Sequence, residues 1–445
     1  MLKPILTIIF LMITSIVLSL ETSNPQKNNA DVYFENLLIG DFDTCYEMSS
    51  AQMQEALPID TLRETWEGIA FQMGGYVGLI RKDVEEKETY QVHIFALEFS
   101  LMVLDMKLTL DDKGVITGLF FTPSAVAKPG SASKMPGYLA PENTDARDVE
   151  FDCEGFMVNA RLTLPSKAGK FPLVLMLTGS GPNDMDETVG TRKPFRDIAD
   201  GLAGRGIATL RWNKRTRDFP EVVKDKNTFT VRDEYLPEVI SALNWLKENG
   251  DLPIDRYFIL GHSMGGLILP MAADEVKGIS GYIMMAGNAR PLEDLVVEQY
   301  RYIFGLDGMT PEEQEELDKI IVQAQAVKQL DEEKPSPDDL LLGIPKAYWL
   351  SLNYYNQTEV FRQQDFPFLI LQGEKDYQVS MADFRLWQEA VKGKKQVKLK
   401  SYPGLDHLFM QTEGDSTPQS YMNPAFVAEQ VIADIADWVT GTGRN

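Results

Sequence analysis

The chain has few of the residues that hold small exported scaffolds or metal centres together. Its 445 residues include two cysteines, Cys45 and Cys153, and three histidines. A disulfide-stapled scaffold needs many more cysteines, and neither cysteine belongs to a Cys-x-x-Cys pair. We therefore expect two buried free thiols, although a bridge between them stays open in an oxidising compartment. Without a cluster of His and Cys, neither a metal site nor another cofactor is expected.

Positive charge is also scarce. Lys and Arg number 43 against 66 Asp and Glu, so the net charge is −23. Surfaces that bind phosphate need positive charge, and we therefore expect neither nucleic acid nor an anionic membrane surface as a partner of the folded chain. The hydrophobic fraction of 44% is that of a soluble globular protein, and the length suits two domains.

A long uncharged run occurs once, at the N-terminus. Lys3 precedes the run, which extends from Pro4 to Leu20 and ends at polar residues. This pattern predicts a signal peptide or a retained N-terminal anchor over residues 1–23. No cysteine follows the run, so a lipid-modified N-terminus is not supported. We expect an exported protein, periplasmic or extracellular.

Two folded segments follow. Over residues 31–123 helical patterns precede alternating strand patterns, which predicts a small α+β domain. Residues 124–147 are rich in Pro, Ser, Gly and Ala and are predicted to be a linker. Over residues 148–445 strands alternate with helices, which predicts an α/β domain with a parallel or mixed sheet covered on both faces. Residues 291–359 are too long for a simple crossover and are predicted to form a helical insertion.

The strongest chemical signal is Gly-x-Ser-x-Gly at Gly261–Gly265, between a predicted buried strand and an apolar helix. A nucleophilic serine on a sharp strand-to-helix turn projects above the sheet, and the helix N-terminus behind it stabilises an oxyanion. We predict that Ser263 is a nucleophile. The alternative is a glycine-rich loop without a catalytic role.

A serine hydroxyl needs a base within hydrogen-bond reach. The chain offers His93, His262 and His407. His262 is the neighbour of Ser263 within the turn, and His93 lies in the first domain. His407, in the loop between the last predicted strand and the last helix, is therefore the predicted base.

The base needs a carboxylate to orient it. Asp376 follows the penultimate predicted strand and is preferred to Glu374 and Asp406, because it completes the order Ser–Asp–His. The predicted oxyanion donors are the backbone N–H groups of Ser180, in the turn after another buried strand, and of Met264.

Residues from about 147 to 440 resemble the α/β-hydrolase superfamily, nearest its prolyl-oligopeptidase and dienelactone-hydrolase-like esterase branch. The stretches that carry the resemblance are Leu177–Asp184, Lys193–Arg215, the Gly261 turn, Gly373–Val379 and Gly404–His407. Thr178 departs from the pattern, since the family usually has His before the oxyanion glycine. Residues 31–123 resemble a domain of unknown function with a nuclear transport factor 2-like cone, found before such hydrolases in exported bacterial proteins.

These observations predict a serine hydrolase that cleaves a small-molecule ester through an acyl-enzyme on Ser263. Two alternatives stay open: a serine peptidase of the prolyl-oligopeptidase type, and a catalytically silent binding protein. The oligomeric state is not predicted.

Two groups of residues each have two interpretations. Aromatic residues of the insertion either line an acyl pocket or pack it onto the sheet. They are Tyr300, Tyr302, Phe304, Tyr348, Trp349, Tyr354 and Tyr355. Arg211, Lys214 and Arg215 either steer an anionic substrate or, as we prefer, form salt bridges.

Overall fold

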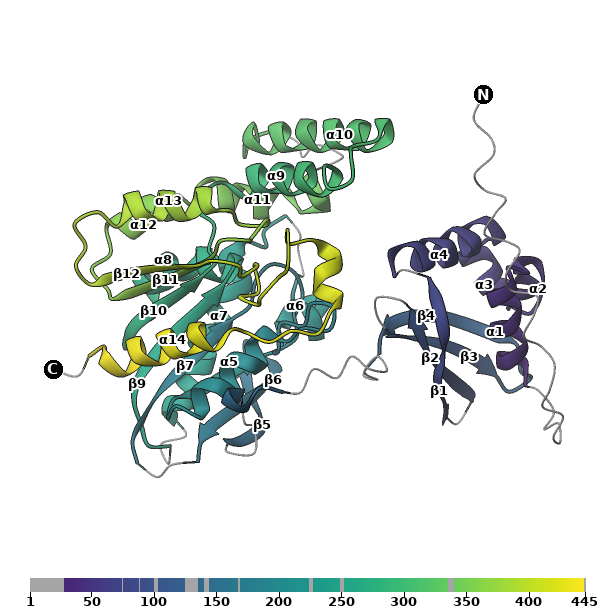
Figure 1. Ribbon diagram of the computed structural model, residues 1–445, viewed down its shortest axis with the longest axis horizontal. Helices are drawn as coiled ribbons and strands as arrows, with labels where there is room; N and C mark the ends of the chain where they lie inside the picture. The colour runs from purple at the N-terminus through teal and green to yellow at the C-terminus, as the bar shows by residue number, and fades with distance from the viewer. Residues whose placement is uncertain are drawn as a thin grey trace. The chain divides into compact units, whose positions relative to one another are not determined.

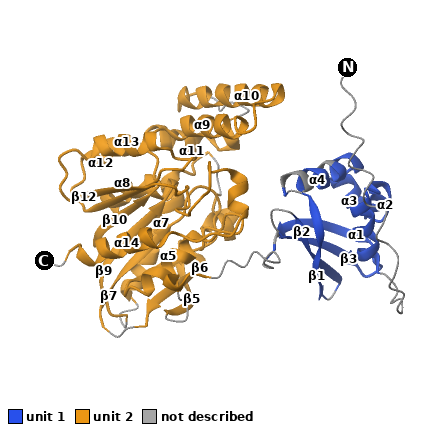
Figure 2. Ribbon diagram, viewed as in Figure 1, with its two compact units in different colours: residues 1–128 blue, residues 129–445 orange. Residues whose placement is uncertain are grey.

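The computed structural model describes residues 28–73, 75–87, 89–99, 103–124, 135–139, 144–166, 169–223, 227–248, 252–334 and 340–443. The chain divides into two compact units, Met1–Lys128 and Pro129–Asn445 (Figure 2). The signal peptide or anchor predicted over residues 1–23 lies outside the described residues. Within the described part of the chain, no helix has the length and apolar character needed to span a bilayer.

The first unit combines short helices with an antiparallel sheet in the order β1-β2-β3-β4 (Figure 1). Its elements are α1 (Asn29–Ile39), α2 (Phe42–Glu47), α3 (Ala51–Ala56), α4 (Ile59–Gln72), β1 (Tyr76–Glu86), β2 (Tyr90–Phe99), β3 (Val103–Asp111) and β4 (Ile116–Pro123). The predicted alternation along β3 is confirmed, because Met106 and Leu108 are buried and Lys107 is not. Aromatic rings join helices to sheet, with Trp66 at 6.0 Å from Phe99 between ring centroids.

The second unit contains an eight-stranded mixed sheet in the order β12-β11-β10-β9-β7-β8-β6-β5. Its strands are β5 (Thr144–Cys153), β6 (Phe156–Pro165), β7 (Phe171–Leu177), β8 (Ala208–Trp212), β9 (Ile254–His262), β10 (Ile279–Met285), β11 (Phe368–Gly373) and β12 (Val397–Tyr402). The pairs from β8 to β12 are parallel, whereas β5 and β6 form an antiparallel hairpin that adds to β8. The carboxyl ends of the parallel strands therefore meet at one edge.

Helices cover both faces of this sheet. They are α5 (Pro194–Ala203), α6 (Arg215–Asp218), α7 (Val231–Glu248), α8 (Met264–Glu275), α13 (Met381–Ala390) and α14 (Glu429–Gly441), with short 3-10 turns η1 (Gly137–Leu139), η3 (Pro220–Val222), η4 (Leu341–Gly343) and η5 (Pro418–Met422). Along the buried strand β7, Leu173 and Leu175 belong to one hydrophobic cluster, and Val174 and Met176 belong to the other. Alternate side chains thus enter two cores, which is the predicted sheet covered on both faces.

The predicted insertion separates β10 from β11. It contains α9 (Leu292–Phe304), α10 (Pro311–Lys328), α11 (Lys346–Asn353) and α12 (Gln357–Arg362). Helices α9 and α10 lie side by side (Figure 1). Thr310 and Glu313 form a capping box at the start of α10, which fixes where that helix begins.

The linker predicted over residues 124–147 is wrong in its second half. Leu139 is fully buried in a hydrophobic cluster of the second unit, and the Tyr138 hydroxyl donates to the Val427 carbonyl at 2.8 Å. Strand β5 begins at Thr144. The prediction failed because β5 is an edge strand whose first residues are exposed and polar, so it lacks the apolar alternation of a half-buried strand.

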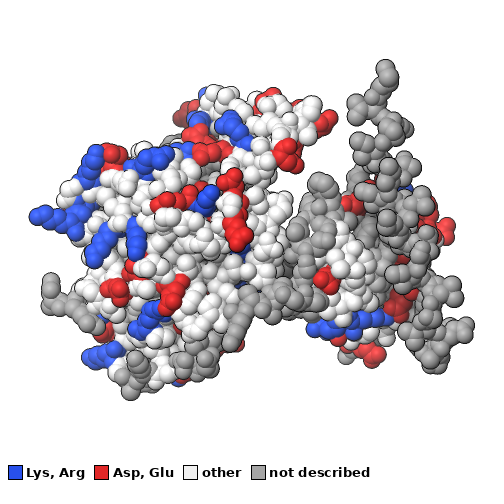
Figure 3. All heavy atoms as spheres, viewed as in Figure 1, with Lys and Arg blue, Asp and Glu red and all other residues white. Residues whose placement is uncertain are grey.

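Lysines gather around β12, the edge strand at the other end of the sheet from β5. Figure 3 shows Lys and Arg side chains over the region of α13 and β12. Lys398 and Lys400 lie on the edge strand β12, and Lys392 and Lys394 precede it. Lysine on an edge strand discourages the addition of a further strand from another molecule.

Candidate active site

Ser263 lies on a strained turn between β9 and α8. Its φ of 53° and ψ of −119° fall in a region that residues with a side chain rarely adopt. Its N–H donates to the Met285 carbonyl at 2.8 Å, which ties the turn to the neighbouring strand β10. The strained turn expected for a nucleophilic serine is therefore present.

Two glycines make this turn possible by close backbone approach. A Cβ on Gly261 would lie 2.2 Å from the Gly265 carbonyl oxygen, and one on Gly265 would lie 2.4 Å from the Leu177 carbonyl oxygen. Real Cβ atoms do not approach backbone so closely. Only glycine at both positions lets strand, turn and helix meet.

His407 and Asp376 are joined. His407 Nδ1 lies 2.7 Å from Asp376 Oδ2, and both side chains are buried. The other carboxylate oxygen accepts from the N–H groups of Gln378 and Val379 at 2.8 and 2.9 Å. Gln372 donates to Asp376 Oδ2 at 3.0 Å. Asp376 is thus held in place as an acceptor that can orient the imidazole of His407.

The two competing carboxylates have other partners. Glu374 accepts from the Ser401 hydroxyl at 2.7 Å and is exposed. Asp406 is fully buried, pairs with Arg192, and accepts from the Met410 N–H at 3.0 Å. Burial raises the pKa of Asp406, although Arg192 opposes that shift. Among the described residues, neither carboxylate is hydrogen-bonded to the imidazole of His407, which contacts Asp376.

Ser263 follows β9 and His407 follows β12, two parallel strands whose carboxyl ends lie at the same edge of the sheet, but the two residues are not hydrogen-bonded to each other in the described structure. The nearest link runs through His262, whose Nε2 lies 2.9 Å from the His407 carbonyl oxygen. The two imidazole rings are 4.5 Å apart between centroids. Hydrogen bonds of catalytic groups are often long without substrate and tighten when it binds.

The turn that holds Ser180 packs against Ser263. A Cβ on Gly179 would lie 3.1 Å from the Ser263 Cβ. The Gly179 carbonyl accepts from Lys214 Nζ at 2.6 Å and from the Tyr235 hydroxyl at 2.8 Å. In a trans peptide the C=O and the following N–H point in opposite directions, so the Ser180 N–H points away from Lys214.

Met264 supplies the other predicted donor. It is the first residue of α8, where backbone N–H groups have no partner within the helix. Ser180, Ser263 and Met264 all line the same cavity. The predicted donors and nucleophile are therefore brought together, with the Ser180 N–H oriented by two buried side chains that the sequence did not single out for this role.

The basic cluster at the end of β8 is buried and paired. Arg211 contacts Asp186 at 3.0 Å, Lys214 contacts Glu234 at 2.8 Å, and Arg215 contacts Glu238 at 3.3 Å. Salt bridges, the preferred interpretation, are confirmed. These cations are too buried to steer an anionic substrate from solution.

The cavity beside Ser263 has a volume of about 350 Å³ and a largely apolar lining. Apolar and aromatic side chains come from α9, from η4 through the start of α11, from the segment before α7, from the start of α8 and from the loop after β11. They are Val223, Phe229, Met264, Leu292, Leu295, Val296, Leu342, Ile344, Pro345, Tyr348 and Val379. Of the insertion's aromatic residues, Tyr348 lines the cavity, whereas Trp349 is fully buried in the core.

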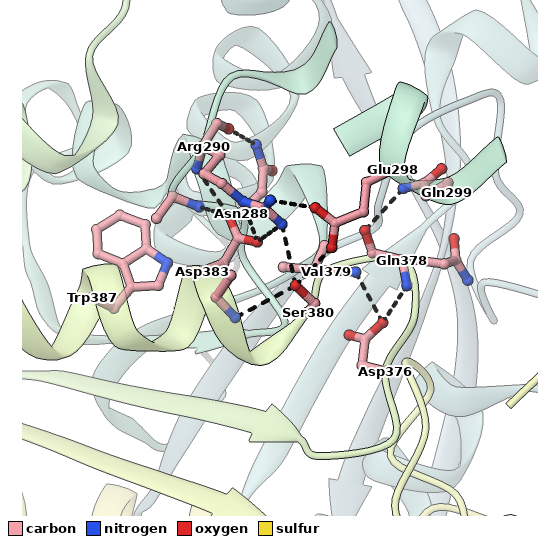
Figure 4. Close-up of polar contacts among 12 residues, drawn as sticks. Asn288, Arg290, Glu298, Gln299, Asp376, Gln378, Val379, Ser380, Asp383 and Trp387 are labelled. Carbon is pink, nitrogen blue, oxygen red and sulfur yellow. Dashed lines mark hydrogen bonds and ion pairs between the residues drawn. The ribbon is translucent and has the colours of Figure 1, made fainter. Parts of the chain in front are cut away.

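The insertion is also attached to the loop that carries Asp376 (Figure 4). Gln299 of α9 donates to the Gln378 carbonyl at 3.0 Å. Glu298, one residue earlier, accepts from the Ser380 hydroxyl at 3.0 Å and pairs with Arg290. Gln299 and Gln378 line the cavity as well. One helical turn of the insertion thus contacts both the substrate cavity and the loop that carries Asp376, which we call the acid loop.

Sequence reasoning missed Arg290, Glu298, Gln299 and Glu187. Glu187 is buried and contacts His262 and the Gly179 N–H. Its only sequence signal is the acidic run Asp184-Met185-Asp186-Glu187. This run comes just after the turn that holds Gly179 and Ser180, which we call the oxyanion turn. Glu298 and Gln299 lie on the insertion and Arg290 just before it, and no local sequence pattern marks their partners in the loop after β11.

No group of three or more His, Cys, Asp or Glu suited to a metal ion occurs among the described residues. Cys45 and Cys153 are buried and free, as expected. The arrangement offers a nucleophile, an oriented base and backbone donors beside an apolar cavity.

Comparison with known proteins gives two family matches. The family model described as "Serine aminopeptidase, S33" matches residues 193–415. The one described as "Protein of unknown function (DUF3887)" matches residues 30–119. Esterase EstD from Thermotoga maritima is 32% identical over 410 residues, which cover 92% of this chain and 94% of the relative.

Solved structures are similar at lower identity. Est1E from Butyrivibrio proteoclasticus is 19% identical, with a TM-score of 0.43, and the match covers 66% of this chain and 99% of that one. An acylaminoacyl peptidase from Pyrococcus horikoshii is 12% identical, with a TM-score of 0.41, and the match covers 80% of this chain and 48% of that one.

Proposed function

The chain belongs to the serine hydrolase family described as serine aminopeptidase, S33, and has the α/β-hydrolase fold, and we propose that it cleaves carboxylic esters through an acyl-enzyme on Ser263. Its curated relative, similar over nearly the whole of both chains, is named an esterase. The substrate is a small-molecule ester. The proposed catalytic residues are Ser263, His407 and Asp376, with the N–H groups of Ser180 and Met264 as oxyanion donors.

The observation that carries this proposal is the character of the cavity beside Ser263. Glu234 is the one acidic side chain among the described lining residues. One of its oxygens contacts Lys214 Nζ at 2.8 Å, and the other accepts from the Tyr348 hydroxyl. A carboxylate engaged on both oxygens is not free to hold a substrate ammonium group. The cavity therefore suits an uncharged acyl group better than a free amino terminus.

Acylation begins when Ser263 Oγ attacks the ester carbonyl and His407 accepts its proton. Asp376 keeps the imidazole in the correct tautomer and stabilises the imidazolium that forms. Negative charge develops on the carbonyl oxygen, where the Ser180 and Met264 N–H groups stabilise it. Donors fixed before reaction begins are worth more than donors that must reorient, and the peptide of Ser180 is held by Lys214 and Tyr235.

Acylation ends when His407 protonates the leaving alcohol and the tetrahedral intermediate collapses to the acyl-enzyme. Deacylation repeats the cycle with water. A water molecule then loses a proton to His407 and attacks the acyl carbonyl. Collapse of the second intermediate returns the proton to Ser263 Oγ and releases the carboxylic acid.

The two rivals predict different substrates. A peptidase would cleave amino-acid arylamides, and a silent binding protein would cleave neither class. We expect the purified protein to hydrolyse p-nitrophenyl esters of short to medium acyl chains, with kcat/KM at least about 100-fold above that for amino-acid p-nitroanilides. Preferential cleavage of the anilides would replace the esterase with a peptidase.

Export is a further part of the proposal. It is supported by Lys3, by the uncharged run from Pro4 to Leu20 and by the polar residues after it. Expression of the full chain in a Gram-negative host, followed by fractionation and N-terminal sequencing, tests it. Mature protein in the periplasm indicates a cleaved signal, full-length protein in the membrane indicates an anchor, and cytoplasmic full-length protein contradicts export.

A further inference from the structure

His262 is the last residue of β9 and the chain neighbour of Ser263, and both of its ring nitrogens face oxygen atoms. Nδ1 lies 2.9 Å from Glu187 Oε1, and Nε2 lies 2.9 Å from the backbone carbonyl of His407. Both side chains are buried. A carbonyl oxygen can only accept, so Nε2 must carry a proton.

The proton between Nδ1 and Glu187 Oε1 belongs to one atom or the other. Glu187 Oε1 also accepts from the Gly179 N–H at 2.5 Å, which favours an ionised carboxylate on that oxygen. Imidazole is ordinarily more basic than a carboxylate by roughly two pKa units. Both considerations leave the proton on His262, which makes it a cation.

We propose that Glu187 and His262 form a buried carboxylate–imidazolium pair that positions two parts of the catalytic site at once. Glu187 holds the N–H of Gly179, the residue before the oxyanion donor Ser180. His262 holds the backbone carbonyl of the catalytic base His407. The roles of these partners rest on the proposed function, whereas the ion pair itself rests on the geometry alone.

The pair completes a clamp on the oxyanion turn. Gly179 is held through its carbonyl by Lys214 and Tyr235 and through its N–H by Glu187. Neither peptide plane that includes Gly179 is then free to rotate. Because His262 is bound to the same carboxylate, the turn and the backbone of His407 are connected through one chain of hydrogen bonds.

The charged and titratable groups around His262 favour its charged form. Burial opposes that form, but the charge and hydrogen bond of Glu187, the carbonyl of His407 and the charge of Asp376 together raise the pKa of His262. The ring of His407 lies beside that of His262, tilted by 51° between the ring planes. We therefore expect His262 to remain protonated at a pH where a solvent-exposed histidine is neutral.

The full chain allows a direct test, because it contains only three histidines. Imidazole NMR of protein labelled with ¹⁵N-histidine distinguishes a ring with both nitrogens protonated from a neutral ring. The signals of His93 and His407 are assigned by their loss in H93Q and H407Q. At about pH 8 we expect His262 to carry protons on both nitrogens. A neutral His262 ring at that pH would overturn the ion pair.

Variants test the positioning role. In E187Q we expect His262 to become neutral at about pH 8 and kcat for an aryl ester to fall roughly 10- to 100-fold, with KM changed less than about threefold. D186N removes the adjacent carboxylate, which contacts Arg211 and Lys193 instead, and should leave the His262 spectrum unchanged. Unchanged kcat in folded E187Q would contradict the positioning role.

The outcomes separate this inference from the proposed function. The NMR spectrum reports the ion pair whether or not the protein turns over esters. Turnover lost in S263A but kept in E187Q would leave the esterase proposal intact and contradict positioning by Glu187. If E187Q does not fold, the kcat of H262Q and the spectrum of the unmodified protein still decide between the outcomes.

Discussion

Asp406 is the neighbour of His407 in sequence, yet its carboxylate points to Arg192 rather than to the imidazole. Its Oδ1 accepts from the N–H groups of Leu408 and Met410, both at 3.0 Å, so it shapes the backbone of the loop. Asp376, 31 residues before His407, is the carboxylate that contacts the imidazole. The two acids near the base therefore have separable roles, one in loop structure and one in orienting the imidazole.

This separation predicts opposite effects of two matched substitutions. D376N should lower kcat by roughly 10³- to 10⁴-fold, because an amide cannot hold the catalytic tautomer, and should change stability little. D406N should retain most of the turnover but lose about 3 kcal/mol or more of unfolding free energy, because Arg192 is left as an unpaired buried charge. Steady-state kinetics and denaturant unfolding of both variants decide the matter. Loss of turnover in folded D406N with normal activity in D376N would exchange the assignments.

Lys214 should act on catalysis through the Gly179 carbonyl. K214M removes one anchor of the oxyanion turn and leaves Glu234 unpaired, so both kcat and stability should fall. The double variant K214M/E234Q removes the unpaired charge. We expect it to recover much of the stability while kcat remains roughly 10- to 100-fold low. Full recovery of kcat along with the stability would mean that Lys214 acts only through folding.

The attachment of α9 to the acid loop predicts that the insertion affects catalysis as well as binding. E298Q weakens the contacts to Arg290 and Ser380, and Q299A removes the bond to the Gln378 carbonyl. Either change should lower kcat/KM for a bulky ester by about 10-fold, with part of the loss in kcat, because a small displacement of Asp376 is costly. E316Q on the exposed face of α10 is the matched control and should be silent. An effect confined to KM would limit α9 to substrate binding.

The Glu187–His262 pair predicts how stability varies with pH. The pKa of His262 is raised in the folded state, so the stabilisation is fully present below the unfolded value of about 6.5 and is lost as pH rises through the folded pKa. The second unit should therefore lose stability as the pH rises above about 6.5 in the unmodified protein, and less so in E187Q. Tryptophan fluorescence can follow this unit, which contains Trp212, Trp245, Trp349, Trp387 and Trp438. Equal slopes in the two proteins would contradict a raised pKa.

The fold was predictable wherever one local pattern decides the structure. Leu104 to Leu110 alternate strictly, and β3 follows. The Gly261–Gly265 motif needs glycine at both ends because the backbones touch, so its context alone predicted the turn. The capping box of Thr310 and Glu313 likewise fixes the start of α10 within four residues. In each case the cause lies within a few residues of the effect.

The remainder depends on contacts between distant segments. The pairing of Gln299 with Gln378 and of Glu187 with His262 joins residues 79 and 75 positions apart. Ordinary polar residues carry these contacts, and nothing in their local sequence marks the partner. The start of β5 was missed for a related reason, since its edge position removes the apolar periodicity that would reveal it.

The most direct test of the central claim is to label the folded protein with a fluorophosphonate and map the adduct by mass spectrometry. A fluorophosphonate phosphonylates a serine only when a base and oxyanion donors activate it. We predict one adduct, on Ser263, formed rapidly in the unmodified protein and in D406N, and formed very slowly in H407A. A folded, unlabelled Ser263, or an adduct on a different serine with ester hydrolysis intact in S263A, would contradict the account.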